Sequence, residues 1–184
     1  MPAIPADVVG FWTFAGPAKW FARSTRFDDA IRLKFEPVHH RAACGEYNAW
    51  TDDPQGALAL LILLDQFPRN LYRGSAHAFA TDPLARAIAG QAIAAGHDQA
   101  VDTLLRPFFY LPFEHSEAMA DQDRSVALFE AHDAATGDID SLTWAVNHRD
   151  VIKRFGRFPH RNAALGRETT PEEMVFLEEG GFSG

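Results

Sequence analysis

The sequence is poor in cysteine and has no long hydrophobic run. Its single cysteine, Cys44, excludes an internal disulfide. Cys44 stands among small residues at an expected helix end, so we expect a buried, inert thiol rather than a nucleophile. The longest uninterrupted apolar run, Ala57–Leu64, is far shorter than the roughly 20 residues that span a bilayer. No membrane protein is therefore expected.

Positive charge is also scarce. The chain has 25 Asp and Glu against 17 Lys and Arg, for a formal net charge of −8. Such a chain repels phosphate backbones, so nucleic-acid binding is not expected. The N-terminal residues lack a basic region and carry an acid at Asp7, which argues against a signal peptide and for a cytoplasmic protein. Phosphate-binding loops and dinucleotide fingerprints are absent, so the sequence predicts no cofactor.

What is present predicts one all-α domain over residues 1–184. A chain of this length, 47% hydrophobic, can bury its own core. No window alternates apolar and polar residues, so we expect no sheet. Helical spacing and boundary signals predict helices that begin at Val8 and end before Gly16, and others at about Asp28–Glu36, 54–66, 83–95, Glu117–Thr136, Asp140–Phe155 and from Pro171 onward.

Proline and capping residues suggest where the helices begin. Pro37 is expected to start a separate or kinked helix that runs to Cys44-Gly45. Asp53-Pro54 and Asp82-Pro83 each place a capping residue before a proline, and Thr170-Pro171 opens the last helix.

The segment 54–66 is apolar on every side, which is typical of a helix surrounded by other helices. Because the connections are short, we expect antiparallel helix pairs arrayed around this fully buried central helix.

Three segments carry more polar and aromatic chemistry around a proline than packing requires. They are Leu64–Gly74, Phe108–Glu117 and Phe155–Asn162. The first and third echo each other, as Phe-Pro-Arg-Asn and Phe-Pro-His-Arg-Asn. Four longer runs that contain these segments resemble the bacterial domain-of-unknown-function 924 family, over about Val8–Phe182, namely Leu58–Gly74, Ala78–Ala85, Phe108–Glu117 and Arg154–Asn162. The resemblance implies an all-α fold similar to tetratricopeptide-repeat (TPR) arrays, and it implies no particular activity.

The third segment has the composition of an anion site. Pro159 favours the first turn of a helix, where free backbone N–H groups and the helix dipole would act together with His160 and Arg161. Six of the 17 Lys and Arg fall between Arg149 and Arg167. Arginine suits bidentate recognition of carboxylate or phosphate. The predicted ligand-binding residues are Asp65, Arg69, Asn70, Arg73, Arg157, Arg161 and Asn162.

A purely structural role is the alternative for the same residues. Arg and Asn beside proline in tight turns often donate to the last carbonyls of a neighbouring helix. Asp65 and Arg69, four residues apart, are placed to form a buried ion pair. Tyr72-Arg73-Gly74 has the form of a helix stop. The sequence leaves both interpretations open.

Glu114 and His115 suggest proton transfer. They follow a run of aromatic residues, where desolvation raises the pKa of a carboxyl group, and an imidazole titrates near neutrality. With His160, they are the candidate catalytic residues. Against this interpretation, adjacent helical residues point about 100° apart, and Glu114 is equally compatible with a helix N-terminus.

No metal site is predicted. His39-His40 are adjacent, and Pro37 interrupts the Glu36-x-x-His39 spacing. His132 and His148 lie on expected helices beside apolar residues, and we interpret both as core histidines. The remaining candidate ligands could form a metal site only if the fold brought them together, namely Glu46, His115, His132, His148 and His160.

Two classes of function follow. In the first, the three segments converge on one cleft of Arg, His and Glu that binds a small anionic metabolite, in a binding protein or an enzyme. In the second, the helical array is a protein–protein interaction scaffold with structural Arg and Pro turns. Exposed tryptophans would then anchor the protein partner, although most are expected in the core: Trp12, Trp20, Trp50 and Trp144.

Overall fold

The computed structural model describes residues 3–182, and these residues form helices and turns without a strand. The predicted all-α fold is therefore confirmed. The described chain divides into two compact units. Unit 1 comprises the residues up to Arg73 together with His77–Pro112, and unit 2 comprises Gly74–Ala76 and the residues from Phe113 onward. The predicted single domain stays a prediction, and each unit is described by itself.

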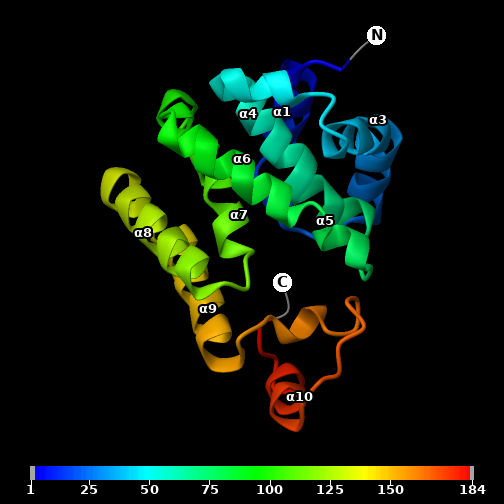
Figure 1. Cartoon of the computed structure of the whole chain (residues 1–184), viewed down its shortest axis with the longest axis vertical. Helices are drawn as coiled ribbons and strands as arrows, with labels where there is room; N and C mark the ends of the chain where they lie inside the picture. Colours follow the sequence, from blue (N-terminus) through cyan, green and yellow to red (C-terminus); the bar gives the residue numbers. More distant parts are fainter. Residues whose placement is uncertain (1–2, 183–184) are drawn as a thin grey trace. The chain divides into compact units, whose positions relative to one another are not determined.

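Unit 1 is built from helices of different lengths (Figure 1). In chain order they are α1 (Pro5–Ala15), α2 (Pro17–Trp20), α3 (Thr25–Ala43), η1 (Asn48–Asp52), α4 (Pro54–Leu61), the π-turn η2 (Ile62–Gln66), α5 (Phe67–Leu71), α6 (Asp82–Ala94), η4 (His97–Ala100) and η5 (Arg106–Phe109). Two short helices have residues in both units, namely η3 (Ala76–Phe79) and α7 (Leu111–Glu114).

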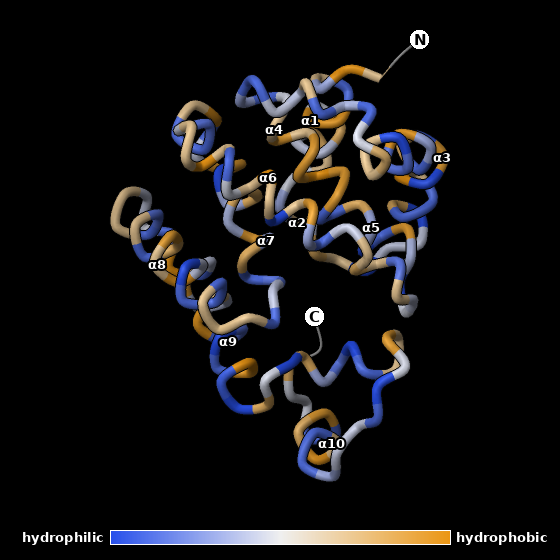
Figure 2. Tube along the Cα trace, in the orientation of Figure 1, coloured by the Kyte–Doolittle hydropathy of each residue, from blue (hydrophilic) through white to orange (hydrophobic). Residues whose placement is uncertain are grey.

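The predicted central helix exists as α4 and its continuation through η2. Every residue from Gly56 to Pro68 is buried, and the hydropathy colouring of Figure 2 is hydrophobic along α4. Helices α1 and α6 pack against α4, and α3 packs against η2 and α5. The carboxylate of Asp53 accepts from Gly56 N at 3.0 Å, as the predicted N-cap does. A Cβ on Gly56 would lie 2.1 Å from the Trp50 carbonyl oxygen, so this position requires glycine.

The π-turn η2 accommodates Pro68. The N–H of Phe67 donates to Ile62 O, five residues back, instead of Leu63 O. Pro68 has no N–H to donate to Leu64 O. The carbonyls of Leu63 and Leu64 thus lose their usual α-helical donors. They accept instead from side chains of other elements, Leu63 O from His39 Nδ1 and Leu64 O from the Thr81 hydroxyl.

One boundary prediction in unit 1, a separate helix that begins at Pro37, is wrong. Pro37 starts no separate helix, because α3 continues through it to Ala43. A buried stripe at helical spacing, Phe27, Ile31, Phe35 and His39, runs past the proline, and its packing offsets the roughly 3 kcal/mol that an internal proline costs.

Cys44 is exposed rather than buried, since it lies just beyond the end of α3, outside that stripe. Its small neighbours in the sequence do not decide which side of the chain end faces solvent.

The side-chain cap predicted at Asp82-Pro83 does not form. Helix α6 does begin at Asp82, but its N-cap residue Thr81 makes no side-chain capping bond. The Thr81 hydroxyl donates to Leu64 O instead, and the Asp82 carboxylate accepts a hydrogen bond from Arg69.

Unit 2 contains α8 (Met119–Thr136), α9 (Ile139–Phe155), η6 (Pro159–Arg161) and α10 (Pro171–Glu178) (Figure 1). Helices α8 and α9 pack together, and only Gly137 and Asp138 connect them, so they form an antiparallel pair. Thr170 and Glu173 close a capping box that begins α10, as predicted. A TPR-like array stays a prediction. Within residues 3–182, the helices are too short or too polar to cross a membrane.

Candidate functional site

The arginines of the first segment are held by carboxylates. The Arg69 guanidinium donates to both oxygens of Asp82 at 3.1 Å and lies 3.5 Å from Asp65 Oδ1. Burial lowers the pKa of Arg69. The carboxylates of Asp65 and Asp82 raise this pKa by more, so it lies above its ordinary value. Arg69 also donates to the carbonyl of Ala78 at 2.9 Å. The Asp65–Arg69 ion pair of the structural alternative is therefore present, and anion binding by these residues stays a prediction.

Asn70 and Arg73 meet at a different carboxylate. Asn70 Nδ2 donates to Asp28 Oδ1 at 2.7 Å, and Arg73 donates to both Asp28 oxygens at 2.7 and 3.0 Å. Burial alone would raise the pKa of Asp28, but these donors hold it below its ordinary value. Together the two side chains tie α5 and the turn that follows it to α3.

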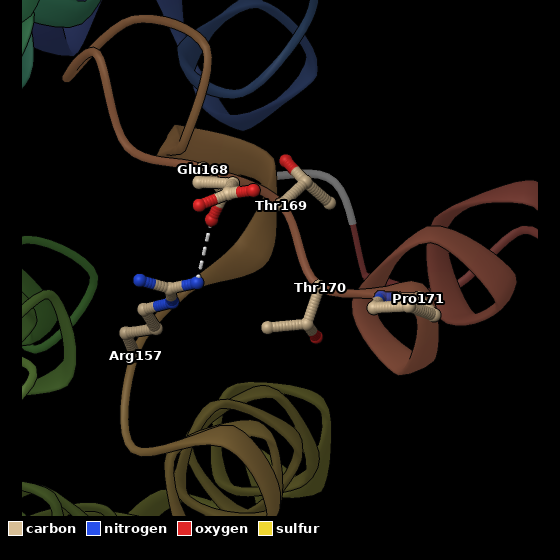
Figure 3. A pocket seen from close by; sticks show the side chains of 5 residues that line it. All are labelled: Arg157, Glu168, Thr169, Thr170 and Pro171. Atoms are coloured by element: carbon tan, nitrogen blue, oxygen red, sulfur yellow. Dashed lines mark hydrogen bonds between the residues drawn. The ribbon is translucent and has the colours of Figure 1, made fainter.

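In the third segment, Arg157 and Asn162 converge on the buried Glu173. Arg157 donates to both Glu173 oxygens at 2.6 and 2.8 Å, and Asn162 Nδ2 donates to Oε2 at 3.1 Å. The bonds from Arg157 are the main reason why the pKa of Glu173 falls to about 2. Arg157 also lines a pocket of about 390 Å³ with residues 168–171, where it donates to the carbonyl of Glu168 (Figure 3).

Arg161 clamps the backbone of the second segment. Pro159 begins a 3₁₀ helix of only three residues, η6, rather than a full helical turn with free N–H groups. The Arg161 side chain is buried, lies over the ring of Phe158 with its guanidinium carbon 4.4 Å from the centroid, and donates to His115 O at 3.0 Å. The predicted anion-binding arginine is thus at the same time a structural donor.

Glu117 and Arg167 form a connection that sequence reasoning missed. Arg167 donates to both Glu117 oxygens, at 2.8 and 3.1 Å, and to the carbonyl of Phe158 at 3.0 Å. Glu117 in turn accepts from Phe158 N at 2.8 Å. The partners lie 41 and 50 residues apart in the chain, so no local spacing reveals them.

The Glu–His cluster, which consists of Glu114, His115 and His148, is the strongest candidate site. One ligand atom from each of the three side chains lies within 4.8 Å of the other two. Glu114 Oε1 is 3.1 Å from His148 Nδ1, and both side chains are at least nine-tenths buried. Glu114 ends α7 and His148 lies on α9, so two helices bring the cluster together within unit 2. Glu114 and His115 are adjacent in the chain, yet their side chains reach the same cluster. This is possible because α7 ends at Glu114, so the 100° rotation between helical neighbours does not apply to His115.

His148 is held as a neutral imidazole. Burial is the main reason why its pKa falls to about 3, and electrostatic interactions with His115, Arg161 and His160 lower it further. Its Nδ1 lies 2.8 Å from the Trp144 carbonyl, which only accepts, so the proton is on Nδ1 and the lone pair on Nε2. His148 is buried, as expected of a core histidine, but the sequence did not indicate that it meets Glu114.

Aromatic rings surround this cluster. The His148 ring meets Phe158 at 5.6 Å and Phe182 at 4.3 Å between centroids. His160 contacts the same two rings, at 5.6 and 5.3 Å. The structure therefore brings the predicted residues Glu114, His115, His160 and Arg161 into one region of unit 2.

The chain resembles known bacterial proteins over almost its whole length. A comparison with curated proteins gives no match. The protein of unknown function ATU0120 from Agrobacterium tumefaciens is 52% identical, and the match covers 96% of this chain and 97% of that one with a TM-score of 0.90. The family model described as bacterial protein of unknown function (DUF924) matches residues 8–181. The chain belongs to this bacterial family of unknown function.

Proposed function

We propose that the protein is an enzyme that binds a small carboxylate- or phosphate-bearing compound at the Glu–His cluster. The observation that carries this proposal is the convergence of Glu114, His115 and His148 in one buried place. A carboxylate and two imidazoles within reach of one another are the usual components of a proton-transfer centre.

The electrostatic surroundings favour an anion. Arg161 lowers the pKa of His148, and its guanidinium is a permanent positive charge beside the cluster. Arg161 holds the His115 carbonyl, so its charge stays beside the cluster. In this proposal Arg161 and His160 attract the anion, and Glu114 and His115 act on it.

The test is a thermal-shift panel with inorganic phosphate, acetate and succinate. Wild-type protein is expected to melt roughly 5–10 °C higher at an anion concentration one hundred times Kd. Arg161→Gln should lose the shift, Arg161→Lys should keep much of it, and Arg154→Gln, which removes an exposed charge of the same unit, should keep all of it. A wild type that responds to no anion contradicts the proposal.

The scaffold alternative rests on Trp144. This side chain of α9 is 55% exposed, whereas Trp12 and Trp20 are buried and Trp50 is half-buried. Exposed tryptophan is typical of binding surfaces. The alternative requires that Trp144→Ala abolish capture of a protein partner while the anion response persists.

A further inference from the structure

The Glu–His cluster has the donor set of a metal site. It offers one carboxylate oxygen and two imidazole nitrogens, all within 4.8 Å of one another. Three protein ligands of this kind leave a further coordination position for water or substrate, which is the arrangement of catalytic metal centres. Glu114 and His148 are almost fully buried and His115 is half-buried, so the group has one side toward solvent.

We propose that Glu114, His115 and His148 bind a divalent transition-metal ion, and that this ion binds the anionic compound directly. The second part rests on the proposed function, and the first does not. Mixed nitrogen and oxygen ligands suit Zn²⁺, Fe²⁺ or Co²⁺, whereas Mg²⁺ and Ca²⁺ prefer oxygen alone.

The distances fit such an ion. Bonds of roughly 2.0–2.1 Å in a tetrahedron place ligand atoms about 3.3 Å apart. The three ligand atoms of the group all lie within 4.8 Å of one another, which is close to this spacing.

The hydrogen bonding of His148 also fits. A ligating histidine commonly donates its second N–H to a backbone carbonyl. His148 has this arrangement, with Nδ1 bonded to Trp144 O and a lone pair on Nε2.

The charge count links the metal ion to the anion. Glu114 contributes one negative charge, whereas the ion brings two positive charges beside Arg161, which lies at His115 O. The excess of positive charge makes an anionic ligand on the open coordination position favourable. Metal ion and anion should therefore strengthen each other's binding.

The experiment is a titration of chelator-treated full-length protein with Co²⁺, followed by visible absorption and by competition with Zn²⁺. Wild type should bind one equivalent. His115→Asn, at the half-buried position, and Glu114→Gln should each weaken binding by more than the roughly 10–100-fold that changes outside the ligand shell cause. His132→Asn, which changes another buried histidine of unit 2, should bind as wild type does. Circular dichroism checks that each variant is folded.

Two outcomes overturn the metal site. One is wild type that gives no visible cobalt spectrum, and the other is His115→Asn that binds cobalt as tightly as wild type. The anion panel is then repeated on metal-free and metal-loaded wild type. Metal binding without any anion response leaves the metal site standing and contradicts the proposed function. An anion response of equal size in metal-free protein supports the proposed function and contradicts direct binding of the anion by the ion.

Discussion

At the scale of single residues, the arginines in the motifs each have a carboxylate or a carbonyl as partner. Arg157 and Arg69 form bidentate pairs with Glu173 and Asp82, and Arg161 holds a backbone carbonyl. The planar guanidinium that makes arginine suitable for anions also makes it suitable for these bonds. Sequence composition alone therefore does not separate the two uses.

The Glu173 network predicts a pH dependence of stability. The folded-state pKa of Glu173 is about 2, below its ordinary value of 4.5. The ionised group therefore stabilises the fold above about pH 4.5, and this contribution is lost as the pH falls toward 2. The difference in unfolding free energy between wild type and Glu173→Gln should be full at pH 6 and shrink between pH 4.5 and 3, as measured by urea denaturation.

The neighbouring Glu172→Gln is the matched control, since Glu172 forms an exposed pair with Arg154. It should change the unfolding free energy by no more than roughly 1 kcal/mol. A Glu173→Gln difference that stays constant from pH 6 to pH 3 would show that the ionised carboxylate does not supply the stabilisation.

At the scale of elements, proline shapes unit 1 in two ways. Pro37 lies inside α3, where the buried stripe on either side keeps the helix continuous. Pro68 instead follows a π-turn, and its missing N–H is balanced by donors from other elements. The same residue type thus has different effects, and the packing around each proline decides which effect occurs.

The π-turn gives a prediction for Thr81→Val. The substitution keeps the shape of the side chain and leaves the Leu64 carbonyl without the Thr81 hydroxyl. A buried acceptor left unpaired costs roughly 1–3 kcal/mol, so the urea midpoint should fall accordingly. Thr143→Val removes an exposed hydroxyl bonded to Ile139 O and should cost no more than about 0.5 kcal/mol. Equal losses in the two variants would contradict this account of η2.

At the scale of the whole molecule, negative charge dominates. The net charge is −8, and three of the six basic residues between Arg149 and Arg167 already pair with carboxylates, namely Arg154, Arg157 and Arg167. Half of the basic residues in this stretch are therefore paired with acids.

We accordingly expect no binding to nucleic acid. Fluorescence anisotropy of a labelled 20-base-pair DNA duplex should stay unchanged on addition of the protein at 0.15 M salt, because too few free cations are available to release counterions. A basic DNA-binding protein serves as the positive control. Binding that weakens steeply as salt is raised would contradict this expectation.

The sequence by itself determined the helical class, the buried central segment and several helix starts, because these depend on local periodicity and capping. Gly56 to Pro68 is buried and Thr170 caps α10, as their neighbours in the chain indicated. Only the tertiary structure decided the rest. Whether Pro37 breaks a helix depends on packing along the whole of α3. That His148 meets Glu114 depends on how α9 packs against the end of α7, and a contact across 34 residues of chain has no local signal.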